Sequence, residues 1–419
     1  MRKQLINIII LRIINLIIYY LSGIALAKLL VPENFDIVAF ILNVILFLSV
    51  LVRSGMDPSI PWIFNKFNFR NHLKKCKKII LTCNIFNFIF LIILSFFLLK
   101  KKNFDEVNNL LFFIGISLNV YFYSFLLLAG ELFKARGTYD IFLLRFQTLF
   151  SGSGLFLSSL YFFYLSKFNF IYFVIIFYLI IFLLSSLLIF KYLIFENNFS
   201  EKINIPHNQT SSTKYLISQV NSTLFTFIPV MIIFFLDKKN GNAGYLFLVL
   251  KFGELISYPI HIIAPTFYKY FFHEIKKKNI QNLLRKYFSS LKLNASMSLI
   301  IFFLMAIFVY FFSEIFFKND FFILNLKFIL ILFTSHFLTS CFGPIGQLFL
   351  ISANTKYLSN VSIFVNVISI LLGIFLYIIV KLSILNSIII IVSMGIILYR
   401  LILLIIFFRL KEKNKFFKQ

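Results

Sequence analysis

Charged residues are scarce in this sequence of 419 residues. Lys, Arg, Asp and Glu together make up 13% of the chain, where about 25% is typical of a soluble domain. By contrast, 60% of the residues are hydrophobic and Phe alone occurs 61 times. That is more apolar surface than a globular core of this length can bury. The composition therefore excludes a water-soluble protein and indicates one embedded in a lipid bilayer.

Cysteine and the common catalytic motifs are also missing or sparse. The three cysteines are scattered as Cys76, Cys83 and Cys341, which gives neither a disulfide framework nor the ligand pairs of a zinc site. The sequence has no Walker motif, no GxGxxG and no HExxH, so no phosphate, dinucleotide or zinc chemistry is indicated. We expect no structural metal, no cofactor and no enzyme activity.

What the sequence has in abundance is long apolar runs. A helix needs about 20 apolar residues to cross the hydrocarbon core, and we predict an all-α polytopic membrane protein with about 12 transmembrane helices. The spans are expected near 4–27, 36–52, 79–99, 109–129, 141–165, 168–190, 215–236, 243–266, 293–313, 325–350, 357–380 and 384–408.

The excess of basic residues indicates orientation in the membrane. The net charge of +26 would suggest nucleic acid in a soluble chain, but its distribution follows the predicted spans. With both termini in the cytoplasm, 27 Lys and Arg lie on the inner side and 10 on the outer side, as the positive-inside rule requires. The expected partners of this charge are anionic lipid headgroups, and no nucleic acid is expected.

Repeated features indicate an internal duplication. Two basic segments, roughly 53–78 and 267–292, follow the second and eighth spans, and both are expected to be loops. We predict two six-helix bundles, 1–195 and 214–419, joined by a cytoplasmic linker at 196–213, with a site between them. The alternative is that the two basic loops are alike by coincidence. The first span of each half carries a polar stripe at helical spacing, with Arg12, Asn15, Tyr19 and Ser22 in one and Gln219, Ser222, Thr226 and Pro229 in the other.

Three charged residues lie deep in the predicted spans: Arg12, Lys251 and Glu254. A charge near the middle of the bilayer costs around 3 kcal/mol on insertion scales and suggests a functional site. Lys251 and Glu254 can neutralise each other at a spacing of three, so a structural and a functional pair are both open. Arg12 has no partner in its own helix, which favours contact with a ligand over pairing with Glu254. We expect Arg145 and Arg400 to be shallow and to reach the headgroups.

The candidate substrate-binding residues are those of the two first-helix stripes and the charged pair. They are Arg12, Asn15, Tyr19, Gln219, Ser222, Thr226, Lys251 and Glu254. Two further polar stripes either line water or mark tight helix contacts, and we favour the contacts. These stripes are His336, Ser340, Gly343 and Gln347 in the tenth span, and Ser362, Asn366, Ser369 and Gly373 in the eleventh.

Several segments resemble one family of membrane transporters. ALAKLLVPENFD, residues 25–36, is similar to the signature after the first helix of bacterial O-antigen and capsule polysaccharide flippases, except that Val31 and Asp36 stand where that pattern usually has glycine. These flippases belong to the multidrug/oligosaccharidyl-lipid/polysaccharide exporter superfamily. Weaker resemblance covers most of the chain in order, at residues 51–64, 129–140, 343–366, and Gly244-Tyr245 with Pro259 and Pro265.

The resemblance implies a MATE-like fold and a function. Two six-helix bundles would surround a cationic lumen, and Arg12 matches an arginine often found in the first helix of this family. The implied substrate is an oligosaccharide joined by pyrophosphate to a polyprenyl lipid, flipped across the bacterial inner membrane by alternating access. Polysaccharide polymerase and assembly proteins would be further partners. A cation-coupled multidrug exporter is the alternative, and a membrane-embedded polymerase is a more distant one because the predicted outer loops are short.

Overall fold

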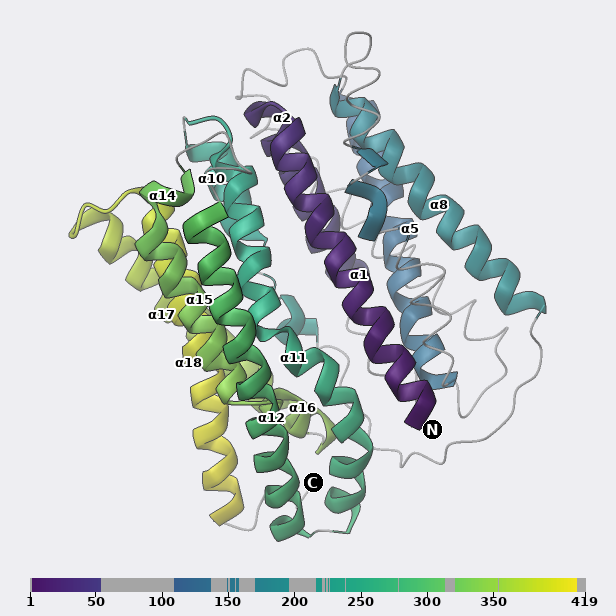
Figure 1. Cartoon of the computed structure of the whole chain (residues 1–419), viewed down its shortest axis with the longest axis vertical. Helices are drawn as coiled ribbons and strands as arrows, with labels where there is room; N and C mark the ends of the chain where they lie inside the picture. Colours follow the sequence, from purple (N-terminus) through teal and green to yellow (C-terminus); the bar gives the residue numbers. More distant parts are fainter. Residues whose placement is uncertain are drawn as a thin grey trace. The chain divides into compact units, whose positions relative to one another are not determined.

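The computed structural model describes residues 2–53, 109–136, 149, 151–154, 156–157, 170–195, 216–220, 223, 225, 227–237, 239–277, 279–312, 321–352 and 354–412. These residues are helical almost throughout, as predicted for an all-α protein (Figure 1). The third predicted span, most of the fifth, and the proposed linker at 196–213 lie outside the described residues. The chain divides into two compact units, and residues 230–244 belong to the first although they lie in the second half of the sequence.

The first unit comprises Met1–Asn208 and Val230–Gly244. Its described helices are α1 (Arg2–Leu29), α2 (Pro32–Arg53), α5 (Asn109–Arg136), α8 (Phe170–Phe195) and α10 (Ile228–Leu236), which the unit contains from Val230 onward. Helix α2 packs against α1, α5 and α8, and nearly all of its residues from Phe35 to Val52 are buried. A helix that is apolar on every face is expected at the centre of a bundle, and α2 has this place in the first unit.

The second unit comprises Gln209–Pro229 and Tyr245–Gln419. Its described helices are α11 (Asn242–Lys276), which the unit contains from Tyr245 onward, α12 (Ile280–Ile307) with the π-helical turn η3 (Phe308–Phe312), α14 (Phe321–Leu324), α15 (Leu326–Cys341), α16 (Ile345–Ile351), α17 (Thr355–Ile378) and α18 (Ile384–Glu412). Helices α17 and α18 form an antiparallel hairpin, and α15 packs between α12 and α18 (Figure 1).

The prediction of a basic loop at 267–292 is wrong. Helix α11 continues to Lys276 and α12 begins at Ile280, so the connection shrinks to a few residues around Asn279. The Asn279 side chain accepts a hydrogen bond from the backbone N–H of Asn282 and caps α12. Charged residues end the apolar run but do not end a helix, so both helices extend beyond it.

The tenth predicted span is broken between α15 and α16. Gly343 has φ +63°, a left-handed conformation that glycine adopts without steric cost, and Pro344 follows it. The hydroxyl of Tyr287 in α12 donates to the backbone carbonyl of Phe342 at this break. In the eleventh span, the tight helix contact expected from the polar stripe is confirmed at Gly373. A Cβ at this position would collide with Ile391 of α18.

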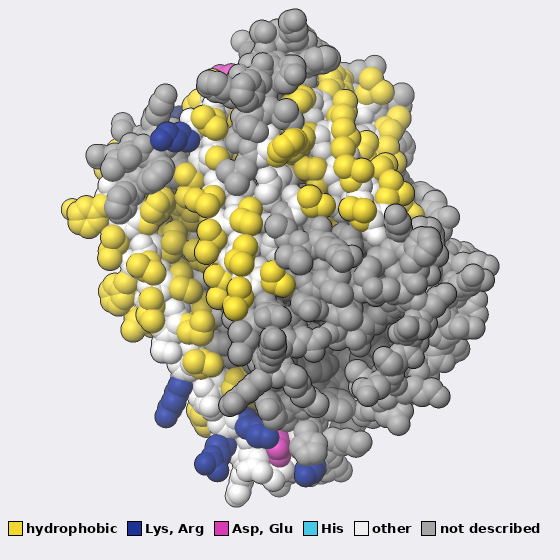
Figure 2. All heavy atoms as spheres, turned by 45° about the vertical axis from the view of Figure 1, so that its right-hand side comes forward, with side chains coloured by type: hydrophobic (Ala, Val, Ile, Leu, Met, Phe, Trp, Pro, Cys, Tyr) yellow, Lys and Arg dark blue, Asp and Glu magenta, His cyan; other side chains and the backbone are white. Residues whose placement is uncertain are grey.

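The surface of the described helices suits a bilayer. Seven of them are long and apolar enough to cross a membrane. Large hydrophobic side chains such as Ile300, Phe303, Leu371 and Ile378 are about half exposed or more. Figure 2 shows apolar side chains over much of the described face in view, with most of the visible Lys and Arg at its lower end. The chain is therefore a polytopic membrane protein, as the composition predicted.

Candidate functional site

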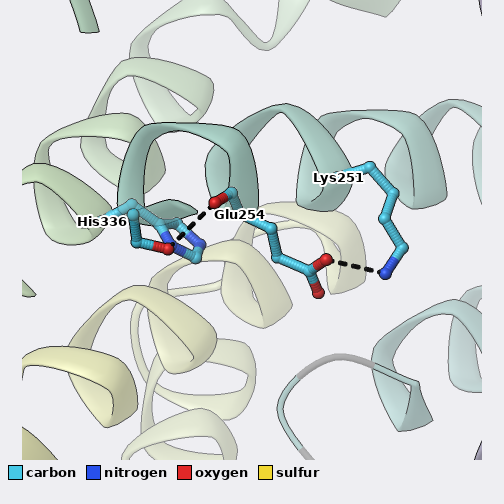
Figure 3. Close-up of polar contacts among 4 residues, drawn as sticks. Lys251, Glu254 and His336 are labelled. Carbon is cyan, nitrogen blue, oxygen red and sulfur yellow. Dashed lines mark hydrogen bonds and ion pairs between the residues drawn. The ribbon is translucent and has the colours of Figure 1, made fainter. Parts of the chain in front are cut away.

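The charged pair predicted in the eighth span forms an ion pair on α11. Lys251 Nζ lies 2.8 Å from Glu254 Oε2, on one face of the helix because the two residues are three apart. The Lys251 side chain is 12% exposed and that of Glu254 is 35% exposed. The carboxylate is thus the more accessible partner, and Figure 3 shows it reaching along the helix to the ammonium group.

Two aromatic rings also lie close to the ammonium group of Lys251. Its Nζ lies 5.5 Å from the ring centroid of Phe227 and 5.8 Å from that of Phe247, within the range of a cation–π interaction. Phe227 belongs to the segment before α10, and Phe247 lies one turn before Lys251 on α11. The cation is therefore stabilised by one carboxylate and two ring faces within the second unit.

His336 of α15 lies against the same part of α11. Its Nδ1 is 3.2 Å from the hydroxyl oxygen of Ser257, and that hydroxyl donates its proton to the backbone carbonyl of Glu254 at 3.0 Å (Figure 3). Gly253 makes this approach possible, because a Cβ at that position would lie 2.6 Å from the imidazole. His336 is 5% exposed, so it has the packed position favoured for the stripe of the tenth span. Lys251, Glu254, Ser257 and His336 are hereafter the α11 site.

Arg400 is a candidate that the sequence reasoning missed. It lies near the middle of α18, about 18 Å from the C-terminal residue of that helix at about 1.5 Å per residue, and its expected shallow position in the bilayer stays a prediction. Its Nη1 faces Gly346 of α16, 3.3 Å from where a Cβ would lie there. Tyr287 and Tyr399 are close enough to interact with it electrostatically. None of the carboxylates described in the structure forms an ion pair with Arg400.

The polar stripe of α1 lies on a helix as predicted, and its members differ in burial and in their contacts. Asn15 is buried and Tyr19 is half-buried. Ser22 donates to the carbonyl of Ser151 at 2.7 Å, and Gly154 leaves no room for a Cβ beside it, so Ser22 is a helix-contact residue. The backbone of Arg12 lies in α1, on the face that Asn15 and Tyr19 share, and its side chain is outside the described part.

The second stripe is only partly described. Gln219 is half-buried in the helical segment 216–220, whereas Ser222 and Thr226 lie outside the described residues. The structure brings Lys251 and Glu254 together in the second unit, and Asn15 and Tyr19 together on one helix of the first. Within the described ranges, no three His, Cys, Asp or Glu side chains form a group able to hold a metal ion.

No family model matches the sequence, and no curated protein does. Solved structures do match in fold. An inward-facing multidrug resistance MATE family transporter of the MOP superfamily has a TM-score of 0.66 at 15% identity over 96% of each chain. The outward-facing form of such a transporter has a TM-score of 0.60 at 14% identity over 100% of this chain and 96% of the other.

A MOP superfamily transporter from Pyrococcus furiosus, described as having a binding pocket of reversed polarity that suggests a different function, has a TM-score of 0.64. It is 15% identical to this chain over 100% of this chain and 96% of its own. The similarity runs along the whole length in each case, although the identity is low. The chain therefore has the all-α fold of MATE and MOP superfamily transporters.

Proposed function

We propose that the chain is an alternating-access transporter that flips a polyprenyl-pyrophosphate-linked oligosaccharide from the inner to the outer leaflet of a bacterial cytoplasmic membrane. The fold supports alternating access, since transporters of this fold have been captured in inward-facing and outward-facing forms. In this mechanism one half of the protein rocks against the other around a central site.

Arg400 is the main reason for proposing an anionic substrate. A cation within a membrane-spanning helix is costly unless an anion compensates it, and no described carboxylate does so here. A guanidinium stays protonated and offers a planar pair of donors that fits a pyrophosphate. Arg12 of α1 would add a second such group from the first unit.

The α11 site adds a second kind of cation, the Lys251 ammonium group, which an anionic substrate can bind. Lys251 is held by Glu254, and Glu254 is the more exposed of the two. An anionic headgroup approaching from the exposed side would compete with this carboxylate for Lys251 and gain a charge-assisted hydrogen bond. Amide and hydroxyl groups such as those of Asn15, Tyr19 and Gln219 suit the hydroxyls of a glycan, and the lipid tail can stay in the bilayer.

A multidrug exporter is the second candidate, and it fits the similar structures at least as well, since several of them are multidrug transporters by name. The half-exposed carboxylate of Glu254 is the observation in its favour, because a cationic drug needs an acidic partner. Against it, Glu254 is already neutralised by Lys251 at 2.8 Å.

Deletion of the gene separates the two candidates. If the chain is a flippase, the deletion strain lacks the surface glycan and accumulates lipid-linked oligosaccharide, while its resistance to cationic drugs is unchanged. A plasmid copy restores the glycan. Unchanged surface glycan together with lowered drug resistance would instead identify the multidrug exporter.

A further inference from the structure

Two of the segments singled out in the sequence meet in the first unit. Asp36 of α2, which stands where the flippase pattern usually has glycine, accepts hydrogen bonds from two backbone N–H groups at the start of α11. Gly241 N lies 2.7 Å from Asp36 Oδ2, and Gly244 N lies 2.7 Å from Oδ1. Asp36 as a whole residue is only 7% exposed. Asp36 thus caps α11 from another helix, and its charge favours the N-terminal end of the helix dipole.

A second polar contact lies beside the first. Asn240 Nδ2 donates to Glu33 Oε1 at 2.6 Å, one turn before Asp36 on α2. The turn itself is shaped by Asp237, whose carboxylate accepts from the backbone N–H of Lys239 at 3.0 Å and from Asn242 Nδ2 at 2.8 Å. The connection between α10 and α11 is therefore ordered by its own contacts and tied to α2 by two acidic side chains.

Apolar contacts bury the same segment. A Cβ at Gly244 would collide with the ring of Phe35, so only glycine allows this approach. The rings of Phe40 and Phe234 are stacked with centroids 4.4 Å apart, and Val230 and Ile233 are almost entirely buried. Residues 230–244 are thus packed into the first unit over most of their length.

We propose that Asp36, Gly241 and Gly244, together with Glu33 and Asn240, form a clasp that stays closed throughout transport. Asp36 is a positioning residue: it fixes the start of α11, and Lys251 follows Gly244 by about 10 Å along the same helix. The chain passes between the units at Pro229–Val230 and at Gly244–Tyr245, and the clasp holds the segment between these two points in the first unit. This inference rests on alternating access, and it does not depend on which substrate is carried.

The contacts explain why the clasp stays closed. Opening it would leave a buried carboxylate without its two donors, which is the costly way to break a buried charged interaction. It would also separate the stacked rings of Phe40 and Phe234. A gate that opens in every cycle would be built from weaker and more exposed contacts.

Hydrogen exchange tests the clasp without any substrate. In the full-length protein, the amides of Gly241 and Gly244 should be protected, and Asp36→Asn should speed their exchange about tenfold or more, because the amide keeps the size of the carboxylate but offers one acceptor oxygen. Glu33→Gln is the matched control, since it keeps an acceptor for Asn240 and should leave these two amides protected. Rapid exchange of both amides in the unaltered protein would overturn the proposal.

Cross-linking asks whether the clasp opens. Cysteines replace Glu33 and Asn240 in a protein from which Cys76, Cys83 and Cys341 have been removed, and a short bis-thiol reagent joins them. A closed clasp predicts rapid linkage and full transport by the linked protein. Linkage that blocks transport would contradict the proposal, as would failure to link. The hydrogen-exchange rates and the rate of cross-linking do not depend on the substrate. They would be the same if the protein carried drugs and not glycan, so the clasp and the proposed flippase function can be refuted independently.

Discussion

Single charged residues inside the spans differ in what surrounds them. Lys251 has a carboxylate at 2.8 Å and two aromatic rings, whereas Arg400 faces Gly346 and none of the described carboxylates pairs with it. An ion pair is neutral as a unit, but a cation in a membrane helix without an ion-pair partner among the described residues still needs an anion. If the proposed substrate is correct, we therefore expect the arginines to bind its anionic headgroup.

Substitution of Arg12 distinguishes charge from geometry. Arg12→Lys keeps the charge but loses the bidentate donors, and Arg12→Gln loses the charge but can still form hydrogen bonds. We expect the Lys variant to retain part of the glycan export and the Gln variant to lose nearly all of it. Immunoblots of the membrane fraction check that protein levels match. Normal export by Arg12→Gln would leave Arg12 as a packing or topology residue.

Arg400→Gln should also reduce export strongly while leaving the protein in the membrane. The control is Arg409→Gln on the same helix, because Arg409 is exposed near the end of α18 and should tolerate the change. Surface glycan per cell is the measurement. Equal export by both variants would remove Arg400 from the site.

The Lys251–Glu254 pair is tested by comparing single and double changes. Glu254→Gln alone leaves a buried cation without its carboxylate and should lower the amount of protein, whereas Glu254→Gln with Lys251→Met should restore it. Membrane protein levels measure this structural role, and surface glycan measures transport. Full export by the double variant would show that the pair is only structural.

At the scale of helices, hydropathy predicted where spans lie better than where helices end. The apolar runs gave the correct centres for α2, α5, α8, α17 and α18. The error at 267–292 arose because hydropathy marks the edge of the bilayer, and Lys and Glu are good helix formers outside it. The helix caps, not the charges, carried the information on where α12 begins.

The break between α15 and α16 depends on one glycine. Gly343→Ala should destabilise the protein by about 1–2 kcal/mol, because the left-handed backbone penalises a Cβ even though the nearest atoms would be 3.7 Å away. Gly152→Ala is the control, since Gly152 is helical and has comparable space. Thermal unfolding of both purified variants measures the difference. Equal melting temperatures would show that the break does not need glycine.

The whole molecule is expected to have both termini in the cytoplasm, from the 27-to-10 division of basic residues. Cysteine-free protein with single cysteines at Ser59 or Gln281 tests this map. Both positions should resist impermeant thiol reagents in intact cells and react after permeabilisation. Labelling of either in intact cells would overturn the orientation.

The site was predictable only in part. Lys251 and Glu254 were found because their charges stand out in an apolar run and their spacing is helical. The rings of Phe227 and Phe247 were not, since one Phe among 61 carries no signal. Nor was the contact between Asp36 and the start of α11, because it joins residues about 205 apart in the sequence, and helical periodicity reports only local neighbours.

Flipping by the purified protein is the most direct test of the proposed function. Vesicles containing the protein and a polyprenyl-pyrophosphate oligosaccharide are treated with an impermeant glycosidase, which trims only the glycan exposed outside. With active protein, trimming should pass beyond the initially exposed fraction toward completion, and Arg12→Gln and Arg400→Gln should stop near that fraction. Trimming that stops there with the unaltered protein, while the same vesicles take up a cationic drug, would contradict a lipid-linked oligosaccharide as the substrate.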